Sequence, residues 1–302
     1  MLPIPLWLDR PFVLLTATAF IWGGNAVAGR FADGHVSPMW LTFGRWAIAV
    51  SLVGWFARAA IRAEWPALKR HWRYLAAMGA TGFTLFNFLL YTAAKYTSAI
   101  NVALLQSAMP LFIFAMGYAA FRTRVAWLQV AGFALTAAGV WVTATYGDVL
   151  AVLRGNGPGA NVGDLIMLLA AVAYAAYSVG LRAKPDLHPL AFLFAIMLAA
   201  LGTATLGLGV EIVAGTAMAP HDAQGWLVVI YAGLFAAIVA QALYIRGVEQ
   251  VGANVAGLFI NLVPVFAALL SVVLLGEALQ PFHAVAFVLV VGGVWLAGRA
   301  SP

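Results

Sequence analysis

The chain has 302 residues, of which 64% are hydrophobic and only 9% are charged. An ordinary soluble protein has about 25% charged residues, so this low charged fraction and the mean hydropathy of +0.97 exclude that class. The net charge of +6 does not indicate nucleic-acid binding, because the basic residues are scattered at the ends of apolar stretches. The absence of cysteine excludes disulfides, thiolate metal sites and cysteine catalysis. The sequence therefore predicts an all-α membrane protein.

Ten apolar stretches of about 18 to 23 residues are long enough to cross the hydrocarbon core as helices. Short connectors with proline or glycine separate them, as at Ser37-Pro38 and at 155–159. The first stretch is longer than a signal-peptide core, so we expect it to remain as a span. The predicted spans are 11–31, 38–57, 73–94, 98–120, 126–146, 163–182, 189–211, 225–245, 253–275 and 282–299.

The basic residues predict the orientation. If the N-terminus is cytoplasmic, most of the sixteen Lys and Arg residues fall in cytoplasmic connectors. The positive-inside rule then places both termini in the cytoplasm, with the chain in a bacterial inner membrane. The outer connectors would hold Arg30, Lys95 and Arg154, and the inner ones Arg10, Arg58, Arg62, Lys69, Arg70, Arg73, Arg122, Arg124, Arg182, Lys184, Arg246 and Arg299.

The two halves of the chain align with each other at a shift near 153 residues. Tyr91 then falls on Tyr244, and Asn101-Val102-Ala103 falls on Asn254-Val255-Ala256. Each half, 1–150 and 160–302, would hold five spans, and this odd number requires the second half to enter the membrane inverted. The predicted fold is therefore ten transmembrane helices in two inverted five-helix repeats, an arrangement typical of alternating-access transporters.

Two prolines lie near the middle of predicted spans four and nine. Pro110 and Pro264 each remove a backbone donor and free the carbonyl four residues earlier, at Gln106 and Ile260. The pattern suits either moving hinges or static kinks, and the sequence leaves both open.

Polar and aromatic side chains recur on single faces of several predicted spans. A helix in lipid would not turn such groups outward, so they either bond neighbouring helices or line a cavity. Their repetition in both halves favours a cavity, and the aromatic members suit an aromatic or cationic ligand. The predicted substrate-binding residues are Trp22, Asn25, Asn87, Tyr91, Asn101, Gln106, Tyr174, Tyr177, Gln241, Tyr244, Asn254 and Asn261.

Arg45 lies about 10 Å of helix rise inside the second predicted span. A charge at this depth is costly unless it reaches the interface or is paired. Three interpretations follow: the side chain reaches the membrane surface, it pairs with a carboxylate such as Asp164, or it contacts the carboxylate of a substrate.

Several chemistries have no signal in the chain. The acidic residues all lie in connectors or near span ends, so no proton relay at the membrane midplane is visible. The sequence predicts neither an enzyme nor an ATPase, because it has no intramembrane catalytic cluster and no phosphate loop. No metal or cofactor is expected. The expected partners are a small-molecule substrate and the lipid bilayer, without nucleic acid; the oligomeric state is open and compatible with a monomer.

Several segments carry a family resemblance: Trp22-Gly23-Gly24-Asn25, Pro38 with Arg45, the run from Tyr91 to Ala99 before Pro110, and its echo from Tyr244 to Pro264 followed by Gly276-Glu277. On these residues the chain resembles the drug/metabolite transporter superfamily, in particular its ten-span members with tandem EamA domains. The first half departs from the pattern, because Arg122-Thr123 stands where the second half has Gly276-Glu277.

Length and aromatic richness are most similar to the YddG-type aromatic amino-acid exporters. The resemblance implies export of phenylalanine, tyrosine, tryptophan and related small metabolites through a central cavity. The alternative is efflux of cationic or aromatic drugs such as methyl viologen, although the related four-span drug pumps use a glutamate in span one, which this chain lacks. A third alternative is a non-transporting scaffold or a membrane enzyme.

Overall fold

The computed structural model describes residues 10–122, 127–150, 161–260 and 262–299, except for the side chains of 252–255, 257–258 and 298. These residues form helices and turns, with no strand among them. The first half contains α1 (Pro11–Phe31), α2 (Pro38–Arg70), α3 (Trp72–Met78), the π-helix η1 (Gly79–Leu85), α4 (Phe86–Tyr96), α5 (Ala99–Gln106), α6 (Met109–Phe121) and α7 (Trp127–Ala144). The second half contains α8 (Val162–Gly180), the 3-10 helix η2 (Leu181–Ala183), α9 (Pro189–Val213), α10 (Ala223–Ile230), the π-helix η3 (Tyr231–Val239), α11 (Ala240–Ile260), α12 (Val263–Leu270), the π-helix η4 (Ser271–Leu275) and α13 (Pro281–Gly298).

The described helices are long and apolar enough for a membrane protein. Eight helical stretches satisfy both criteria for a span, and Val263–Leu275 and Pro281–Ala297 are shorter apolar helices. The all-helical membrane fold is therefore confirmed, while the count of ten spans stays a prediction. The bounds of α1 agree with the expected 11–31, because Pro11 supplies the fixed φ favoured in the first turn of a helix.

Two boundaries differ from expectation. Helix α2 does not end near residue 57 but runs to Arg70. Its last turns are rich in Ala, Arg and Lys, which are strong helix formers, so the helix continues after its apolar stretch ends. Helix α11 likewise continues through 246–252, where the sequence predicted a connector.

Pro110 lies near the middle of the apolar stretch Ala99–Phe121, as predicted, but it follows a short interruption of the helix. Helix α5 ends at Gln106, and Pro110 is the second residue of α6. In the second half α11 ends at Ile260, and Pro264 is the second residue of α12. The first turn of a helix tolerates proline because its N–H groups have no intrahelical partner there. In the first half the helix is therefore interrupted just before the proline, and in the second half Pro264 stands in the first turn of α12.

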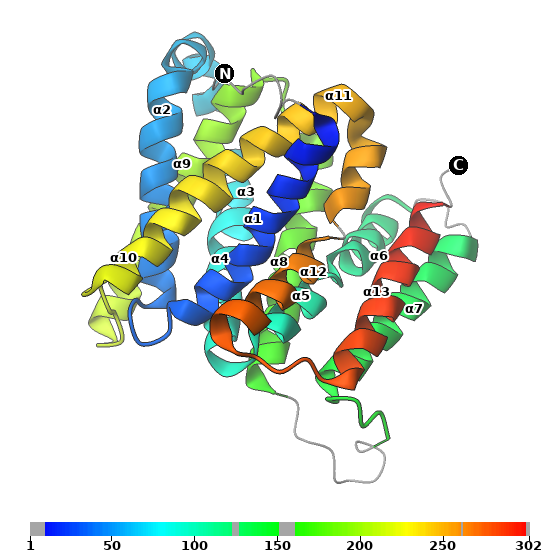
Figure 1. Ribbon diagram of the computed structural model, residues 1–302. Coiled ribbons are helices and arrows are strands. Elements are labelled where there is room, and N and C mark those ends of the chain that lie inside the picture. Colours follow the sequence, from blue (N-terminus) through cyan, green and yellow to red (C-terminus); the bar gives the residue numbers. More distant parts are fainter. Residues whose placement is uncertain (1–9, 123–126, 151–160, 261, 300–302) are drawn as a thin grey trace.

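The packing of the two halves follows the internal repeat (Figure 1). The π-helices η1 and η3 begin at Gly79 and Tyr231, a shift close to that of the sequence alignment. Helix α1 packs on α11, and its counterpart α8 packs on α4. Two further large contacts join helices that occupy the same place in the two halves: α2 packs on α9, and α7 packs on α13. This pairing supports a duplicated five-helix unit; the inverted relation of the two units stays a prediction.

Small residues let the paired helices approach closely. A Cβ on Gly132 of α7 would overlap the carbonyl oxygen of Gly293 on α13, and the reverse also holds. Lipid provides little hydrophobic drive between helices, so this backbone approach and its van der Waals contact hold such a pair together. The α7–α13 pair therefore depends on the two glycines.

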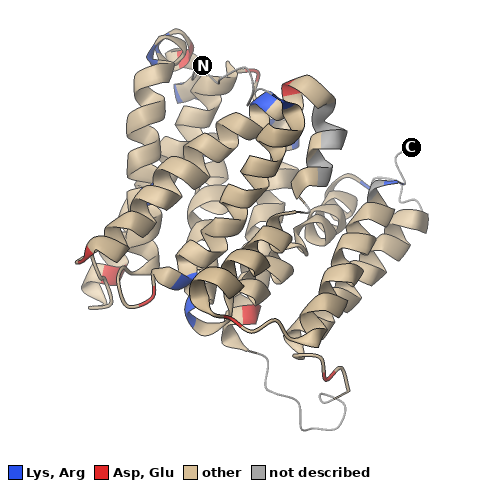
Figure 2. Cartoon of the chain, viewed as in Figure 1, with Lys and Arg blue, Asp and Glu red and all other residues tan. Residues whose placement is uncertain are grey.

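The surface is apolar around the helices and polar at the two ends. Large side chains such as Leu206, Val213, Val273 and Val288 are exposed on helix faces, as expected for contact with lipid. We call the end where α1 begins and α13 ends the terminal end, and the other the α1–α2 end (Figure 1). Basic residues gather at the terminal end, whereas acidic residues gather mainly at the α1–α2 end (Figure 2).

The loops at the α1–α2 end join the two halves. The Ser37 N–H donates to the Met218 carbonyl at 2.9 Å, and the Ser37 hydroxyl donates to Glu211. Asp222 caps α10 by accepting from the Gly225 N–H at 2.8 Å. This backbone bond and the neighbouring His35 lower the pKa of the Asp222 carboxyl. Asp222 is therefore a carboxylate at neutral pH.

A valine at Gly132 should destabilise the fold. The added side chain must push α7 away from α13, and overpacking of this kind costs about 1–3 kcal/mol. Thermal unfolding of the purified protein in detergent should show a midpoint several degrees lower for Gly132→Val than for Gly202→Val. Gly202 is also helical but has no neighbouring atom within 4 Å of an added Cβ, so it controls for helix propensity. Equal midpoints would contradict the proposed dependence on Gly132.

Candidate functional site

Arg45 is buried in the bundle and bonded to neutral groups only. Its side chain comes from α2, is 7% exposed, and donates from Nη1 to the Asn25 Oδ1 at 3.0 Å and the Tyr91 hydroxyl at 2.8 Å. The Tyr91 hydroxyl in turn donates to the Asn25 Oδ1 at 3.0 Å. Three predicted residues from α1, α2 and α4 thus form one closed cluster, which we call the Arg45 cluster.

The position of Asn25 depends on the two glycines before it. A Cβ on Gly23 would lie 2.8 Å from the Ala267 nitrogen of α12, and a Cβ on Gly24 would overlap the hydroxyl of Tyr231 on η3. Tyr231 also donates to the Ile21 carbonyl at 2.7 Å. The second half of the chain therefore packs directly against α1 beside the Arg45 cluster.

The charge of Arg45 has no carboxylate partner among the described residues. The expected pairing with Asp164 is wrong, because Asp164 accepts from the Thr97 hydroxyl at 2.7 Å instead. The side chain is not extended to the surface of the protein either, since it is buried. The Arg45 Nε is buried without a partner, and the guanidinium lies 5.1 Å from the centroid of the Trp46 ring. A buried cation with unused donor capacity is the main electrostatic feature of the interior.

A row of aromatic rings begins beside Arg45. Trp46 stacks on Phe83 with centroids 4.7 Å apart and planes 12° apart. Phe83 lies 5.6 Å from Tyr177, and Tyr177 lies 5.6 Å from Tyr174. Tyr174 lies 5.1 Å from Phe86, which ends the row. The row joins α2, η1, α4 and α8, and it brings together the two predicted tyrosines of the second half.

Asn87 lies between the Arg45 cluster and the aromatic row on the same helix. Its amide nitrogen donates to the Phe83 carbonyl at 2.7 Å, and its Oδ1 is buried without a partner. Phe83, Asn87 and Tyr91 are spaced by four residues, so they follow one another along one helical face. This face presents an aromatic ring, a free amide oxygen and the hydroxyl bonded to Arg45, in that order.

Trp22, in the middle of α1, and Tyr244, near the start of α11, form a separate pair. Their ring centroids are 5.4 Å apart, and the Trp22 Nε1 donates to the Ala236 carbonyl at 3.2 Å. Both rings line a crevice too narrow for a water molecule, together with Leu15, Thr18, Ala19, Phe259 and Ile260. The structure therefore pairs two predicted site residues from opposite halves.

Asn101 belongs to a different polar network. Its Oδ1 contacts the His283 Nε2 at 3.2 Å, and its amide donates to the Thr97 hydroxyl at 3.3 Å. Thr97 donates onward to Asp164, so four polar side chains link α13, α5 and α8 at the α1–α2 end. The prediction grouped Asn101 with the central site, but these contacts place it away from the Arg45 cluster.

A polar cavity of about 350 Å³ lies next to this network. It offers charges of both signs, since Arg30, Lys95 and Glu277 all line it. Glu277 accepts from the backbone nitrogens of Ala99 at 2.8 Å and Ile100 at 3.2 Å, at the start of α5. The cavity therefore sits at the α1–α2 end and not in the interior.

The remaining predicted site residues have weaker structural support. Gln106 is the last residue of α5 and Gln241 lies in the first turn of α11, and both are partly buried. Asn254 lies within α11, but its side chain is outside the description, and Asn261 lies outside the described residues. Roles for these four, and hinge motion at Pro110 and Pro264, stay predictions.

Sequence reasoning missed Trp46, Phe83 and Tyr231, which border the Arg45 cluster. An aromatic residue in an apolar span gives the same signal whether it packs in the core or lines a site. Two patterns pointed to them in part: Trp46 follows Arg45 directly, and Phe83 stands four residues before Asn87.

Comparison with known proteins identifies the architecture. The sequence model of the EamA-like transporter family matches the chain twice, over residues 10–145 and 161–299. The two matches cover most of the chain and divide it near the predicted boundary between the halves.

Relatives of similar length are named as transporters. The uncharacterized transporters YetK and YyaM of Bacillus subtilis (strain 168) are 26% and 24% identical to the chain. Each match covers 94% of this chain, together with 86% of YetK and 92% of YyaM. A solved structure described as "Crystal structure of protein" is 23% identical, covers 95% of both chains and superposes with a TM-score of 0.63, which shows a similar fold.

Removal of the Tyr91 hydroxyl should destabilise the Arg45 cluster. In Tyr91→Phe the guanidinium loses an acceptor and Asn25 loses a donor, and leaving buried polar groups unsatisfied costs about 1–3 kcal/mol. Thermal unfolding should show a lower midpoint for Tyr91→Phe than for the wild type, whereas Tyr96→Phe, at an exposed tyrosine, should leave it unchanged. A Tyr91→Phe protein as stable as Tyr96→Phe would mean that the hydroxyl does not support Arg45.

Proposed function

The chain belongs to the EamA-like transporter family, and from this premise we propose that it exports amino acids, chiefly aromatic ones, and related small metabolites. Transport would proceed by alternating access around the Arg45 cluster, in a bacterial inner membrane with both termini in the cytoplasm. The single observation that carries the proposal is a buried arginine with neutral partners, placed beside a row of aromatic rings.

Arg45 is suited to bind the carboxylate of an amino acid. A guanidinium binds a carboxylate through two parallel hydrogen bonds, and such charge-assisted bonds are among the strongest in proteins. Asn25 and Tyr91 hold the Nη1 side of the guanidinium, while Nε has no partner. A substrate carboxylate at this free edge would supply the missing negative charge.

Asn87 is suited to receive the ammonium group of the same substrate. Its Oδ1 is an unpaired acceptor, and it is one helical turn from Tyr91. An ammonium has three donors and no acceptor, so it matches an orphan amide oxygen. Asn87 would thus receive the ammonium on the side of the substrate next to the carboxylate bound by Arg45.

The aromatic row is suited to the substrate side chain. Phe83 lies one turn beyond Asn87, and its ring stacks on Trp46 and makes a tilted contact with Tyr177. Offset and edge-to-face contacts between aromatic rings add about 0.5–1.5 kcal/mol each beyond simple burial. Aromatic side chains would therefore bind more tightly here than aliphatic ones.

The repeat offers a mechanism for alternating access. Pro110 and Pro264 lie in corresponding parts of the two halves, at the starts of α6 and α12. Helix α6 contacts α8, and α12 contacts α1. Rocking of the halves about these positions would open the central site to one side at a time. The gathering of basic residues at the terminal end supports its placement in the cytoplasm.

Efflux of cationic drugs is the main alternative. The aromatic row alone would also suit a planar cation such as methyl viologen. However, the charge of Arg45 lies beside the row and repels a cation where no described carboxylate offsets it. The Arg45 cluster therefore favours a substrate with a carboxylate.

Transport into liposomes tests the proposal directly. Purified protein in sealed liposomes should take up labelled tryptophan faster than labelled leucine, and both faster than empty liposomes do, with methyl viologen at the background rate. A pH gradient imposed in parallel reports any proton coupling. Uptake of methyl viologen without tryptophan would support the drug-efflux alternative, and uptake of none of the three compounds would refute the proposal.

Replacement of Arg45 should separate transport from stability. Arg45→Met removes a buried charge, and Asn25 and Tyr91 can still bond to each other, so the unfolding midpoint should stay unchanged or rise. Tryptophan transport should fall at least about tenfold, since losing one partner of a buried charged contact costs about 2 kcal/mol or more.

Arg58→Met is the matched control, because this arginine contacts the exposed Trp55 near the surface. It should leave both the transport rate and the unfolding midpoint close to those of the wild type. An Arg45→Met protein that transports tryptophan at the wild-type rate would exclude Arg45 as the carboxylate site.

A further inference from the structure

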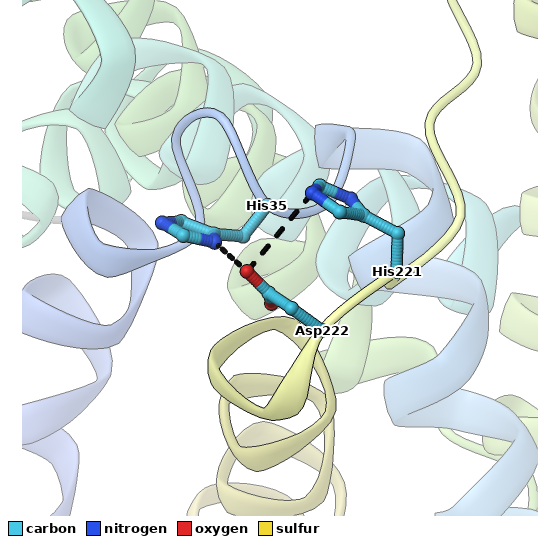
Figure 3. A group of neighbouring side chains, drawn as sticks. All are labelled: His35, His221 and Asp222. Carbon is cyan, nitrogen blue, oxygen red and sulfur yellow. Dashed lines mark hydrogen bonds and ion pairs between the residues drawn. The ribbon is translucent and has the colours of Figure 1, made fainter.

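Two histidines and an aspartate converge at the α1–α2 end (Figure 3). His35 comes from the loop between α1 and α2, and His221 and Asp222 come from the loop between α9 and α10. The His35 Nδ1 lies 2.5 Å from the Asp222 Oδ2, and the His221 Nε2 lies 4.0 Å from the same oxygen. All three potential ligand atoms lie within 4.8 Å of one another.

The orientation of the side chains suits a shared ligand. The two imidazole rings are stacked with centroids 6.1 Å apart and planes 10° apart. Figure 3 shows a nitrogen of each ring directed at one carboxylate oxygen of Asp222. His221 stacks on His35 and also faces Asp222, so the three side chains surround one point.

The carboxylate is held in place by a second contact. Its Oδ1 accepts from the Gly225 N–H at 2.8 Å as the cap of α10, which leaves Oδ2 to face the histidines. Hydrogen bonds of this kind orient metal-binding carboxylates in known sites and keep the ligand atom in position.

The two loops that supply the ligands are already docked. The Ser37 N–H donates to the Met218 carbonyl at 2.9 Å, close in sequence to both histidines. The Gln224 side chain donates to the Phe31 carbonyl at 3.0 Å on the other side. The docked loops hold the three ligand atoms within 4.8 Å of one another, close to the spacing of about 3.3 Å between ligand atoms in a tetrahedral zinc site. His221 is free to rotate, because 57% of its side chain is exposed.

We propose that His35, His221 and Asp222 form a binding site for a divalent transition metal such as Zn²⁺. Two imidazole nitrogens and one carboxylate oxygen match the ligand set of zinc sites that have three protein ligands, with water in the fourth position. Calcium and magnesium are poor candidates, since both prefer shells made almost entirely of oxygen.

A metal at this site would tie the two halves of the chain together. His35 belongs to the first half, and His221 and Asp222 belong to the second. The metal site does not depend on the proposed export function. Only the effect of the metal on transport rests on that function. Bound metal would slow any movement that separates the loops at the α1–α2 end, and it would thereby slow transport.

Zinc binding to tag-free purified protein tests the site. Titration calorimetry should detect one Zn²⁺ per chain in the wild type and in His71→Ala, a control histidine at the far end of α2. Affinity should fall at least about tenfold in His35→Ala and in His221→Ala, as expected on losing a ligand. Equal affinities in all four proteins, or no saturable zinc binding by the wild type, would overturn the proposal.

Asp222→Asn separates the ligand role from the capping role. Asparagine caps a helix as well as aspartate does, so the unfolding midpoint without metal should stay unchanged. Zinc affinity should nevertheless fall, and zinc should raise the unfolding midpoint of the wild type more than that of the variant. Equal stabilisation of both by zinc would exclude Asp222 as a ligand.

The transport arm uses the same pair of proteins. Added zinc should slow tryptophan uptake by the wild type and leave Asp222→Asn unaffected. If neither protein transports tryptophan without zinc, the proposed function fails while the calorimetric result for the site stands. Equal inhibition of both proteins would refute a regulatory effect through this site.

Discussion

The guanidinium of Arg45 must be solvated by the protein, because the bilayer interior contains no water to do so. Three helices meet this requirement: α1 supplies the Asn25 oxygen, α4 supplies the Tyr91 hydroxyl, and α2 carries the charge itself. The three side chains form a closed ring of hydrogen bonds, since Tyr91 also donates to Asn25. Gly23 and Gly24 then allow the second half to pack against α1 at this level. The depth of one charge thus determines which helices of the first half must converge.

The two repeats have diverged around a shared scaffold. In the internal alignment Asn25 and Tyr91 correspond to Tyr177 and Tyr244, and the region of Arg45 corresponds to the apolar pair Met197-Leu198. The first half therefore contributes the polar cluster, whereas the second contributes Tyr174 and Tyr177 to the aromatic row. Backbone features that concern packing are repeated, as with η1 and η3. Tyr91 and Tyr244 are the same residue in both halves, whereas Asn25 and Arg45 have no polar equivalent of the same kind in the second half.

Hydropathy and proline placement predicted much of the fold, because both are local properties. The bounds of α1 followed from Pro11 and the apolar run after it. The extension of α2 to Arg70 was not predictable from hydropathy, since that helix continues after its lipid-facing part ends. The interruption of the helix before Pro110 was not predictable for a related reason. A proline removes one hydrogen bond of a helix, but it does not specify whether the helix bends or ends and begins again.

The site was harder to predict, because its contacts join distant parts of the chain. Helical spacing placed Asn87 and Tyr91 on one face, and the structure adds Asn25 and Arg45 from two other helices. Nothing in the spacing distinguishes Asn25, which bonds Arg45, from Asn101, which bonds His283 and Thr97. The convergence of His35 with His221 and Asp222 depends on loop docking between the halves, which no local pattern encodes.

The neutral partners of Arg45 have a consequence for the proposed transport cycle. An arginine paired with a carboxylate of the protein would offer a substrate little, because the incoming carboxylate would have to displace an existing ion pair. Asn25 and Tyr91 orient the guanidinium without neutralising it, so the empty site retains a desolvated positive charge. Such a charge disfavours any closed state of the empty transporter and favours a state in which water can reach it. In the proposed cycle a substrate carboxylate would remove this penalty and make closure around the loaded site favourable. The same residue that selects a substrate with a carboxylate would therefore also couple substrate binding to the conformational change.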